Sequence, residues 1–591
     1  MSRLFSGIGM DMRHVWRGLT NSKAFTTVAV LSLAIGIGAN AAIFSVIRSL
    51  LLDPMAVPAP EELALVYWYQ DGTQGISSMN SSGYQDAASG VSYRSNVSYP
   101  MYQSMRAAAP AGMQVSAFNF LRDVTVGIGD QPALMAGGLV ADGDFFSVLQ
   151  PGMQLGRPLG PADNQPSAPV VAVLSHAFWR RAFGGDAAVI GRQIRVNGIS
   201  TEIVGVTATE FRGLSKGGFF PQTEVTLPMA AIADLQPQWG DGVSPLTSEK
   251  HHWVRVLVRH RGGADSVAES SPLASVIPGH MRPFTTGDTG QARVLLMNAA
   301  RGLDQTRPEM RRMLYVLMGV VGVVLLIACV NLAGLMLARG VARQREMAVR
   351  RALGASRVRL VRSLLLEGLM LALAGGAAGV LLTFWSSGVL ANAMTTGLAT
   401  GPFGRQPIAV VVDTPLVLVT FALSVVTALI FSLLPAARLT RASHATQLKQ
   451  QAAGSAAPRM TLGRVLVAVQ VGISVPLLVC ALLLLRTVSN LGSVELGFEP
   501  EGLAYFKLDM TAARLPAVEQ RAMYQRVLNA VQAVPGVTSA TSIENVLVSG
   551  LTSNNNVTVN GQQKSLFTNA VGPGFIETMG MRLLTGRAPG L

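Results

Sequence analysis

The residues with the clearest chemical pattern are eight arginines that fall between positions 339 and 362. Glu346 is the only acidic residue among them. A short basic segment between apolar runs has two chemical uses. It fixes the orientation of a membrane protein, because loops rich in arginine stay in the cytoplasm, or it forms a docking surface for another protein.

The basic segment has the spacing of an amphipathic helix. Ala342, Glu346, Val349 and Leu353 recur at i, i+4, i+7 and i+11, so they share one helical face. Glu346 precedes Arg350 by four positions, the favourable order for an ion pair along a helix. We therefore expect a cytoplasmic helix with one apolar face and several arginines beside it.

Two apolar runs must position this helix. Residues 314–338 precede it and residues 363–385 follow it, and each run exceeds the twenty or so residues that span a bilayer. Gly354 predicts the end of the basic helix, and Ser356 predicts the cap of the helix that enters the second run. Together these signals predict a helical hairpin whose tip lies in the cytosol.

These residues also carry a family resemblance. The stretch R-x-x-E-M-A-V-R-R-A-L-G-A-S-R, followed by LLLEGLMLALAGG and preceded by VLLIACVNLAGLMLAR, resembles the coupling region of FtsX-like ABC transporter permeases of the MacB type. In that family the cytoplasmic helix docks on a separate ATPase, and ATP-driven motion passes to an outer domain. The resemblance implies these ATPase-coupling residues: Arg343, Arg345, Glu346, Val349, Arg350, Arg351, Leu353, Gly354 and Arg357.

Composition agrees with a membrane protein. The chain has 591 residues, a mean hydropathy of +0.38 and a net charge of +14, and its basic residues gather beside apolar runs. That pattern favours membrane orientation over nucleic-acid binding, for which no basic patch interleaved with aromatics is present. Cys329 and Cys480 both fall inside predicted spans, so we expect neither a disulfide framework nor a cysteine-based metal site.

The N-terminal segment is expected to be a short amphipathic helix at the membrane surface. Met12, Val15, Trp16 and Leu19 share one face, and arginines lie elsewhere. The apolar run that follows is longer than the core of a secretion signal, so we interpret it as an uncleaved first span. The stretch SLAIGIGANAAIFSVIRSLLL is also typical of the same permease family.

A polar region follows and is expected to form a mixed α/β outer domain. The stretch VVAVLSHAFWRRAFGG predicts a buried strand, a cap at Ser175 and a helix, and Asn197-Gly198 predicts a β-hairpin. WVRVLVRH alternates at period two, which predicts a strand with one buried face. The LSHAFWRRAFGG and G-R-x-I-x-V-N-G segments resemble the MacB-type periplasmic core domain. Five aromatic or imidazole residues are interpreted as ordinary core or surface positions: His176, Trp179, His251, His252 and Trp253.

The spans after the outer domain show further signals. A helix that begins near Pro308 is expected to run unbroken through the second span to Leu353. The third span contains Gly375-x-x-x-Gly379, a spacing of small residues that lets helices approach closely.

An internal repeat is visible at an offset of about 430 to 440 residues. PEGLA at 500 echoes PEELA at 60, and AVGPGFIETMGMRLLTGR echoes LVADGDFFSVLQPGMQLGR. We therefore expect two copies of one unit, the second incomplete. Two explanations remain open: a truncated reading frame, or a homodimer of the first unit.

The expected fold class is an α-helical membrane protein with a mixed α/β extracytoplasmic domain, an FtsX-like permease with a MacB-like periplasmic core domain. The expected domains are a cytoplasmic amphipathic N-terminus (1–23), a first span (24–52), the periplasmic core domain (53–307), a second span with an outer helical extension (308–338), the cytoplasmic coupling loop (339–363), a third span (364–390), a short outer loop (391–410), a fourth span (411–436), a cytoplasmic linker (437–461), a fifth span (462–486) and the start of a second, incomplete periplasmic domain (487–591).

The expected function is that of the membrane subunit of an ABC system. The sequence contains no G-x-x-x-x-G-K-[ST], so the chain is not expected to be an enzyme or to bind a cofactor, and ATP and Mg²⁺ would be bound by a partner ATPase. By resemblance, such systems move an outer domain to export or release a substrate, which the sequence does not identify. Other expected partners are membrane lipid and either a second permease chain or a periplasmic adaptor, and the expected location is the inner membrane with a cytoplasmic N-terminus.

Two alternatives come from other classes. One is an FtsX-like signalling permease that regulates an extracytoplasmic enzyme such as a cell-wall hydrolase, which gene neighbours would distinguish. The other is an ion-coupled transporter, which needs ionisable groups near the membrane midplane. The predicted spans offer only Asn40, Asn331 and Gln470, with Glu367 near one end, which argues against ion coupling.

Overall fold

The structure is a computed structural model and describes residues 8–48, 52–73, 76–78, 83–85, 90–215, 222–235, 243–262, 272–285, 292–303, 308–342, 357–397, 414–441, 461–508, 510, 515–547, 553–559 and 562–588. Contacts divide the chain into a helical unit and an α/β unit. The helical unit comprises residues 1–52, 306–398 and 407–494, and the α/β unit comprises the remaining ones. Each unit is described by itself.

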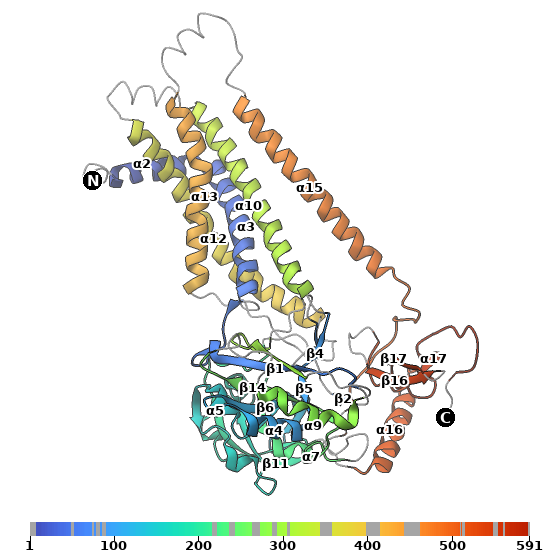
Figure 1. Ribbon diagram of the computed structural model, residues 1–591. Helices are drawn as coiled ribbons and strands as arrows, with labels where there is room; N and C mark the ends of the chain where they lie inside the picture. Colours follow the sequence, from blue (N-terminus) through green and yellow to red (C-terminus); the bar gives the residue numbers. More distant parts are fainter. Residues whose placement is uncertain are drawn as a thin grey trace, which may run out of the picture. The chain divides into compact units, whose positions relative to one another are not determined.

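Among the described residues, the helical unit contains a short helix and five long ones (Figure 1). Four long helices include stretches of 23 to 26 residues that are apolar enough to cross a membrane, and α13 has a shorter apolar stretch, Thr414–Ile430. No described side chain of α15 is buried. The helices are α2 (Ile8–Asn21), α3 (Lys23–Ile47), α10 (Pro308–Ala342), α12 (Arg357–Gly397), α13 (Thr414–Arg441) and α15 (Thr461–Gly492).

Small residues allow α3 and α12 to pack closely, as the G-x-x-x-G spacing predicts. A Cβ added at Gly379 would lie 3.0 Å from the backbone nitrogen of Gly38, and one added at Gly375 would lie 2.5 Å from Cβ of Leu33. The hydroxyl of Thr383 donates to the Gly38 carbonyl at 3.0 Å, so a hydrogen bond joins the two backbones at the same crossing. Only glycine at these positions permits this approach.

Helix α10 is joined to α3 by a buried amide. The Asn40 side chain donates to the carbonyls of Gly36 in its own helix and of Val321 in α10, both at 2.8 Å. Helix α10 is continuous from Pro308 to Ala342. Its expected continuation to Leu353, and the expected turn at Gly354 and Ser356, lie outside the described residues.

The α/β unit contains a 13-stranded mixed sheet. Most neighbouring strands are antiparallel, and β9–β11 and β7–β12 are parallel. The main path runs in this order: β10 (Gln193–Val196), β11 (Ile199–Thr207), β9 (Val171–Leu174), β12 (Val225–Pro228), β7 (Leu134–Ala141), β6 (Gln114–Gly127), β14 (Val254–Arg259), β1 (Leu63–Tyr69), β4 (Ser92–Arg94) and β3 (Gly83–Gln85). Strand β15 (Arg293–Asn298) pairs with β1, β5 (Asn96–Val97) with β14, and β8 (Met153–Gly156) with β11.

Both faces of this sheet are covered. Alternate residues of β1 enter two separate apolar clusters, with Val66 and Trp68 in one and Leu65 and Tyr67 in the other. Helices α4 (Tyr99–Ala108), α6 (His176–Phe183), α7 (Ile232–Leu235), α8 (Pro272–Ser275) and α9 (Ile277–Met281) contribute to the first cluster, and α5 (Phe145–Leu149) contributes to the second.

This two-sided cover corrects one prediction. The alternating sequence of β14 predicts a strand with one buried face, but all six of its residues are buried. Arg255 and Arg259 lie on the face that the alternation assigns to solvent. The guanidinium of Arg259 donates to the carbonyls of Val148 at 2.6 Å and Leu149 at 3.3 Å, and the Glu62 carboxylate, 3.3 Å away, supplies the opposite charge.

The two local predictions for this domain are confirmed. The Ser175 hydroxyl accepts from the Phe178 N–H at 3.2 Å and caps α6, which ends at Gly184 in the left-handed conformation. Asn197 and Gly198 both have positive φ, at 47° and 80°, and they connect β10 to β11 in a two-residue hairpin.

The region after α15 contains α16 (Ala517–Gln532), the hairpin of β16 (Ser553–Val559) and β17 (Gln562–Thr568), and α17 (Phe575–Thr578). Phe145 and Phe575, which correspond in the internal repeat, each begin a short helix. Gly156 and Gly586 both have positive φ, at 66° and 88°. The two repeated stretches therefore share local conformation at these positions.

Candidate coupling site

Two helices flank the arginine-rich segment, and their ends define the candidate site. Eight of the nine predicted coupling residues, from Arg343 to Gly354, lie outside the described residues and stay predictions. The ninth, Arg357, is the first residue of α12. The described structure therefore shows how α10 is held before the segment and how α12 is held after it.

An ion pair joins these two helices. The Arg339 guanidinium lies 2.7 Å from a carboxylate oxygen of Glu367, and the two side chains are only 15% and 11% exposed. Arg339 lies in the last turn of α10, where a cation interacts favourably with the helix dipole. The pair thus links the first arginine of the arginine-rich segment to a residue five positions after its last arginine, Arg362.

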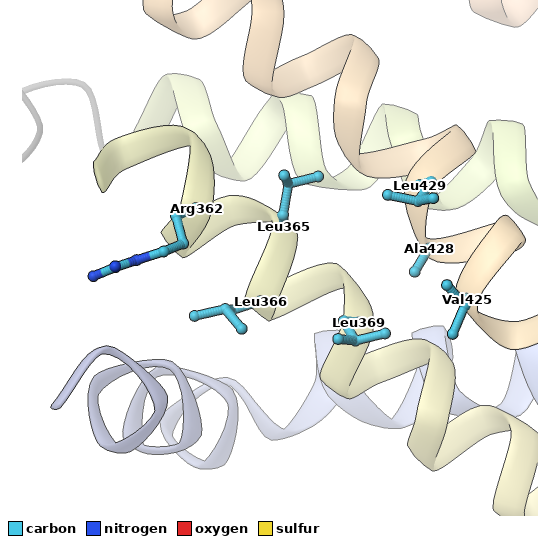
Figure 2. A pocket seen from close by; sticks show the side chains of 7 residues that line it. All are labelled: Arg362, Leu365, Leu366, Leu369, Val425, Ala428 and Leu429. Atoms are coloured by element: carbon cyan, nitrogen blue, oxygen red, sulfur yellow. The ribbon is translucent and has the colours of Figure 1, made fainter. Parts of the chain in front are cut away.

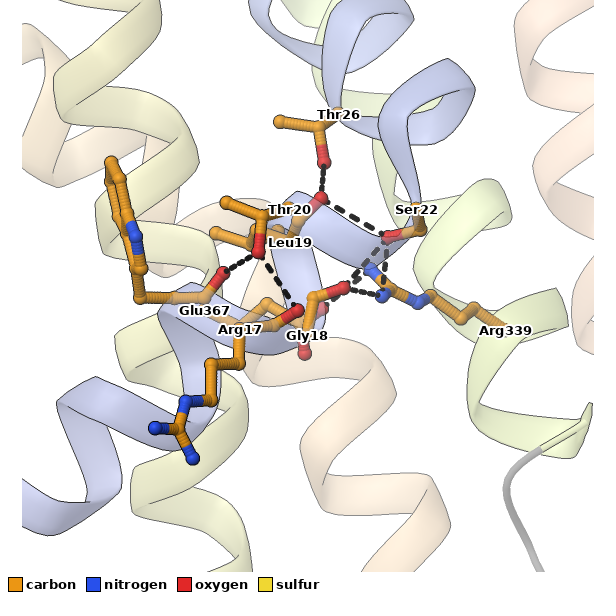
Figure 3. A network of polar contacts seen from close by, with 9 residues as sticks. Arg17, Gly18, Leu19, Thr20, Ser22, Thr26, Arg339 and Glu367 are labelled. Carbon is orange, nitrogen blue, oxygen red and sulfur yellow. Dashed lines mark hydrogen bonds and ion pairs between the residues drawn. The ribbon is translucent and has the colours of Figure 1, made fainter.

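The same arginine binds the junction between α2 and α3 (Figure 3). Its second terminal nitrogen donates to the Gly18 carbonyl at 2.7 Å and to the Ser22 hydroxyl at 2.6 Å. The guanidinium carbon lies 4.6 Å from the centre of the Phe25 ring, within the range of a cation–π contact. One guanidinium therefore connects α2, α3 and α12 to the end of α10.

The last carbonyls of a helix have no hydrogen-bond donor within that helix. The carbonyls at the end of α2 therefore need donors from elsewhere. The Ser22 hydroxyl donates to the Gly18 carbonyl at 2.9 Å, and the Thr26 hydroxyl donates to the Leu19 carbonyl at 2.8 Å. Figure 3 shows these bonds converging with those of Arg339. The hydroxyls of Ser22 and Thr26 and both terminal nitrogens of Arg339 therefore all take part in this network.

The position of α2 agrees only partly with a helix lying on the membrane surface. Val15 and Leu19 are buried in the apolar cluster of the helical unit, together with Leu332 and Met336 of α10. Met12 and Trp16, on the same sequence face, are 45% and 62% exposed. The apolar face of α2 is therefore divided between the bundle and its surroundings.

A buried ion pair of this kind specifies geometry more than it stabilises the fold. Desolvation of two charges offsets most of their attraction, but removal of one partner leaves an uncompensated charge and costs about 3 to 5 kcal/mol. The guanidinium has a planar fork of donors, so it holds the carboxylate, a carbonyl and a hydroxyl in fixed directions. The site is suited to hold α2, α3, α10 and α12 in fixed positions relative to one another.

In the α/β unit, Ser104, His280 and Glu249 form a hydrogen-bonded chain, in the hydroxyl–imidazole–carboxylate order of a catalytic triad. The His280 ring lies 2.8 Å from the Ser104 hydroxyl and 2.9 Å from the Glu249 carboxylate. Ser104 is an interior residue of α4, however, where backbone N–H groups are used within the helix and cannot stabilise an oxyanion. The cluster therefore connects α9, α4 and the loop before β13 (His251–His252) through hydrogen bonds.

Four of the five aromatic or imidazole residues singled out from the sequence lie in the core, and the fifth, His176, is half-buried. Trp253 and His252 are buried at 0% and 1% exposure, and the Trp179 indole donates to the Asp186 carbonyl at 2.8 Å. Within the described ranges, no group of three His, Cys, Asp or Glu side chains is arranged to hold a metal ion.

Sequence reasoning missed the central pair of the site. Arg339 was counted only as one of eight arginines, and Glu367 only as a polar residue near the end of a span. The two lie 28 positions apart on different helices, so no helical spacing relates them. The one available signal was that Glu367 is an acidic residue inside an otherwise apolar run.

Two family models match separate parts of this chain. The family model "MacB-like periplasmic core domain" matches residues 26–270, and the model "FtsX-like permease C-terminal" matches residues 318–443. The second match contains α10 from Met318 onward, the arginine-rich segment, α12 and α13, and therefore both members of the ion pair.

Two curated relatives are named pyoverdine export ATP-binding/permease protein PvdT. The protein from Pseudomonas savastanoi pv. phaseolicola is 26% identical over 281 residues, which are 47% of this chain and 38% of that protein. The protein from Pseudomonas syringae pv. tomato is 24% identical over 303 residues, which are 51% of this chain and 39% of that protein. The matched region thus spans well under half the length of these relatives.

Among solved structures, the periplasmic region of MacB from Actinobacillus actinomycetemcomitans is similar to part of this chain. The likeness covers 43% of this chain and 92% of that one, with 13% identity and a TM-score of 0.27.

Proposed function

Because this chain belongs to the MacB/FtsX type of ABC transporter permeases, we propose that it is the membrane subunit through which a separate ATPase moves a periplasmic domain. Its fold class, a helical membrane protein with a mixed α/β MacB-like domain, is the one that the sequence predicts. The permease component of such transporters is not itself the catalyst. ATP and Mg²⁺ would be bound and turned over by the partner, and this chain would supply the docking surface.

The observation that carries this proposal is the network around Arg339. The segment proposed to dock on the ATPase, residues 343–357, is flanked by α10 and α12, and the Arg339–Glu367 pair joins these helices at its base. A force applied to the segment would therefore move both helices together, and α2 with them through Gly18 and Ser22. A loop that served only to fix topology would need no such anchor.

We propose the inner membrane as the location, with the N-terminus and the arginine-rich segment in the cytoplasm. The charge asymmetry around the spans supports this orientation. The α/β unit would then lie in the periplasm, where it acts on molecules that are already outside the cytoplasm.

Export is the favoured role, since both curated relatives are named as pyoverdine export proteins. Pyoverdine is accordingly the first substrate to test. The alternative, an FtsX-like signalling permease that regulates an extracytoplasmic enzyme, predicts co-purification with a cell-wall hydrolase instead of a periplasmic adaptor.

The coupling proposal is tested with Glu346→Lys and Leu353→Asp. Each variant places an unfavourable charge on the proposed docking face. We expect the affinity for the ATPase to fall by about thirtyfold, because loss of one interface residue that contributes about 2 kcal/mol has that effect. ATP turnover in proteoliposomes should lose its dependence on the permease. Arg312→Glu, an exposed charge reversal in the first part of α10, is the matched control.

The measurement is binding and ATP turnover with the ATPase encoded beside this chain. Both variants should still insert and elute as folded protein. Normal ATPase binding and full activity in both would show that the segment only sets topology.

A further inference from the structure

Helix α2 is placed at the edge of the membrane by the two spans to which it is bound. Ser22 alone separates it from α3, whose apolar stretch begins at Lys23. Arg339, which donates to the Gly18 carbonyl of α2, is the last residue of the apolar stretch of α10. Figure 1 shows that α2 runs across the helical bundle and not along it. Its axis therefore lies close to the plane of the membrane surface.

The side chains of α12 mark the same boundary. A groove of about 160 Å³ between α12 and α13 is lined by aliphatic side chains, and the Arg362 side chain points away from it (Figure 2). Arg362 lies five residues before Glu367, the partner of Arg339. The bundle therefore changes from aliphatic to basic side chains close to the depth of the Arg339 anchor, to which α2 is bound.

The side chains of α2 change character in a fixed order around the helix. Val15 and Leu19 are buried against the bundle, each at 6% exposure. Since each residue turns a helix by about 100°, Met12 and Trp16 lie about 60° further round, and they are 45% and 62% exposed. Arg13, which is also exposed, lies about 60° beyond Trp16. A buried apolar face is therefore followed by an exposed apolar flank and then by a cation.

This order suits a helix that is half immersed among lipid headgroups. We propose that the exposed flank of α2, formed by Met12, Trp16 and Arg13, binds the anionic lipid surface of the cytoplasmic leaflet, with the indole at headgroup depth and Arg13 at a phosphate. An indole prefers this depth because its ring is apolar and its N–H needs a polar partner. An arginine donates two parallel hydrogen bonds to phosphate. The inference rests on the proposed orientation, which assigns this end of the spans to the leaflet that carries anionic lipid.

A cytoplasmic protein would meet the opposite side of α2. Arg17 lies about 180° from the buried pair of Val15 and Leu19, and Figure 3 shows its side chain directed away from the polar network. The exposed flank lies between this side and the bundle, next to the surfaces of the spans. Lipid occupies that place when an amphipathic helix lies in the membrane interface, so the geometry favours lipid over a protein partner.

Lipid bound at the flank would act on the Arg339 anchor. Gly18 follows Trp16 by two residues, and Gly18 and Ser22 accept the hydrogen bonds of Arg339. A flank held at the membrane surface would therefore also hold the end of α10, independently of any ATPase.

The depth of Trp16 is the first test. It uses the full chain without ATPase in nanodiscs of phosphatidylglycerol brominated either near the headgroup or near the end of the acyl chain, and Trp16→Phe isolates the signal of this indole. Bromine near the headgroup should quench Trp16 fluorescence more strongly than bromine near the chain end, and aqueous acrylamide should quench it weakly. Stronger quenching from the chain end would overturn the proposal. Strong quenching by acrylamide with none by either lipid would also overturn it, because the flank would then face the cytoplasm and suit a protein.

The preference for anionic lipid is the second test. Nanodiscs that mix brominated phosphatidylglycerol with plain phosphatidylcholine, and the reverse mixture, report which lipid gathers at Trp16. Phosphatidylglycerol should be enriched about fivefold, the effect expected for one arginine near an anionic surface, and Arg13→Gln should remove most of this enrichment. Arg17→Gln, on the opposite side of the helix, is the matched control and should change it little.

An unchanged enrichment in Arg13→Gln, or an equal loss in both variants, would overturn the proposal. Neither test involves the ATPase, so a failure of the coupling proposal would leave these results unaffected.

Discussion

Arg339 and Glu367 form an ion pair of 2.7 Å between α10 and α12, the helices that precede and follow residues 343–356 in the chain. The same guanidinium reaches Gly18 and Ser22 at the junction of α2 and α3. The α2–α3 junction, α10 and α12, which are far apart in sequence, therefore share one charged anchor.

Removal of the acidic partner tests this anchor. Glu367→Gln leaves the Arg339 charge without its carboxylate in a mostly buried place, so we expect the free energy of unfolding to fall by about 3 kcal/mol. Unfolding in mixed micelles measures it. Arg17→Gln, the loss of an exposed charge on α2, serves as the control and should change little. The double variant Arg339→Met/Glu367→Met should regain most of the loss, and a double variant as unstable as Glu367→Gln would contradict the pairing.

The close crossing of α3 and α12 makes a second prediction. In Gly375→Ala the new Cβ would lie 2.5 Å from Cβ of Leu33, so one helix must shift, and we expect a loss of about 2 kcal/mol in unfolding free energy. Gly322→Ala is the matched control, because no atom lies within 4 Å of its added Cβ and alanine is the better helix former. Leu33→Gly removes the Cβ that the new methyl group would meet, so in a double-mutant cycle Gly375→Ala should cost less in the Leu33→Gly background than in the unchanged chain. Equal effects of the two glycine substitutions would mean that the helices do not touch here.

Orientation is a third prediction, and it follows from the arginine asymmetry. In a background with Cys329→Ala and Cys480→Ser, an impermeant thiol reagent applied to intact cells should label Thr209→Cys, an exposed turn position of the α/β unit. Arg357→Cys should be labelled only after the membrane is opened. The opposite pattern would place the arginine-rich segment outside the cell.

The stability of the α/β unit should depend on pH through His252. Burial lowers the pKa of His252 from 6.5 to about 4, so the unfolded chain binds a proton at pH values where the folded one does not. The stabilisation from the neutral ring is complete above pH 6.5 and is lost as the pH falls towards 4. Between pH 7.5 and 5 this loss amounts to about 2 kcal/mol.

Tryptophan fluorescence during unfolding measures this effect, because Trp68 lies 5.4 Å from the His252 ring. His252→Gln should reduce the difference between the two pH values, although it lowers stability at both. His176→Gln, a change at a half-buried histidine, is the control. An undiminished difference in His252→Gln would assign the pH dependence to other groups.

The sequence by itself determined the features that depend on neighbouring residues. Long apolar runs predict membrane-spanning helices because the bilayer core excludes unsatisfied backbone groups. Ser175 caps α6 and Asn197-Gly198 makes the β10–β11 turn, since each is a local backbone requirement that one or two side chains satisfy. The family resemblance rested on continuous stretches, the longest of them around the arginine-rich segment, and was equally visible.

Only the tertiary structure decided which distant residues meet. No periodicity pairs Arg339 with Glu367, because their contact depends on how α10 and α12 pack and not on either helix alone. The two-sided burial of β14 likewise depends on a second apolar cluster that its own alternation does not reveal. Burial is a property of what covers a surface, and the covering elements come from elsewhere in the chain.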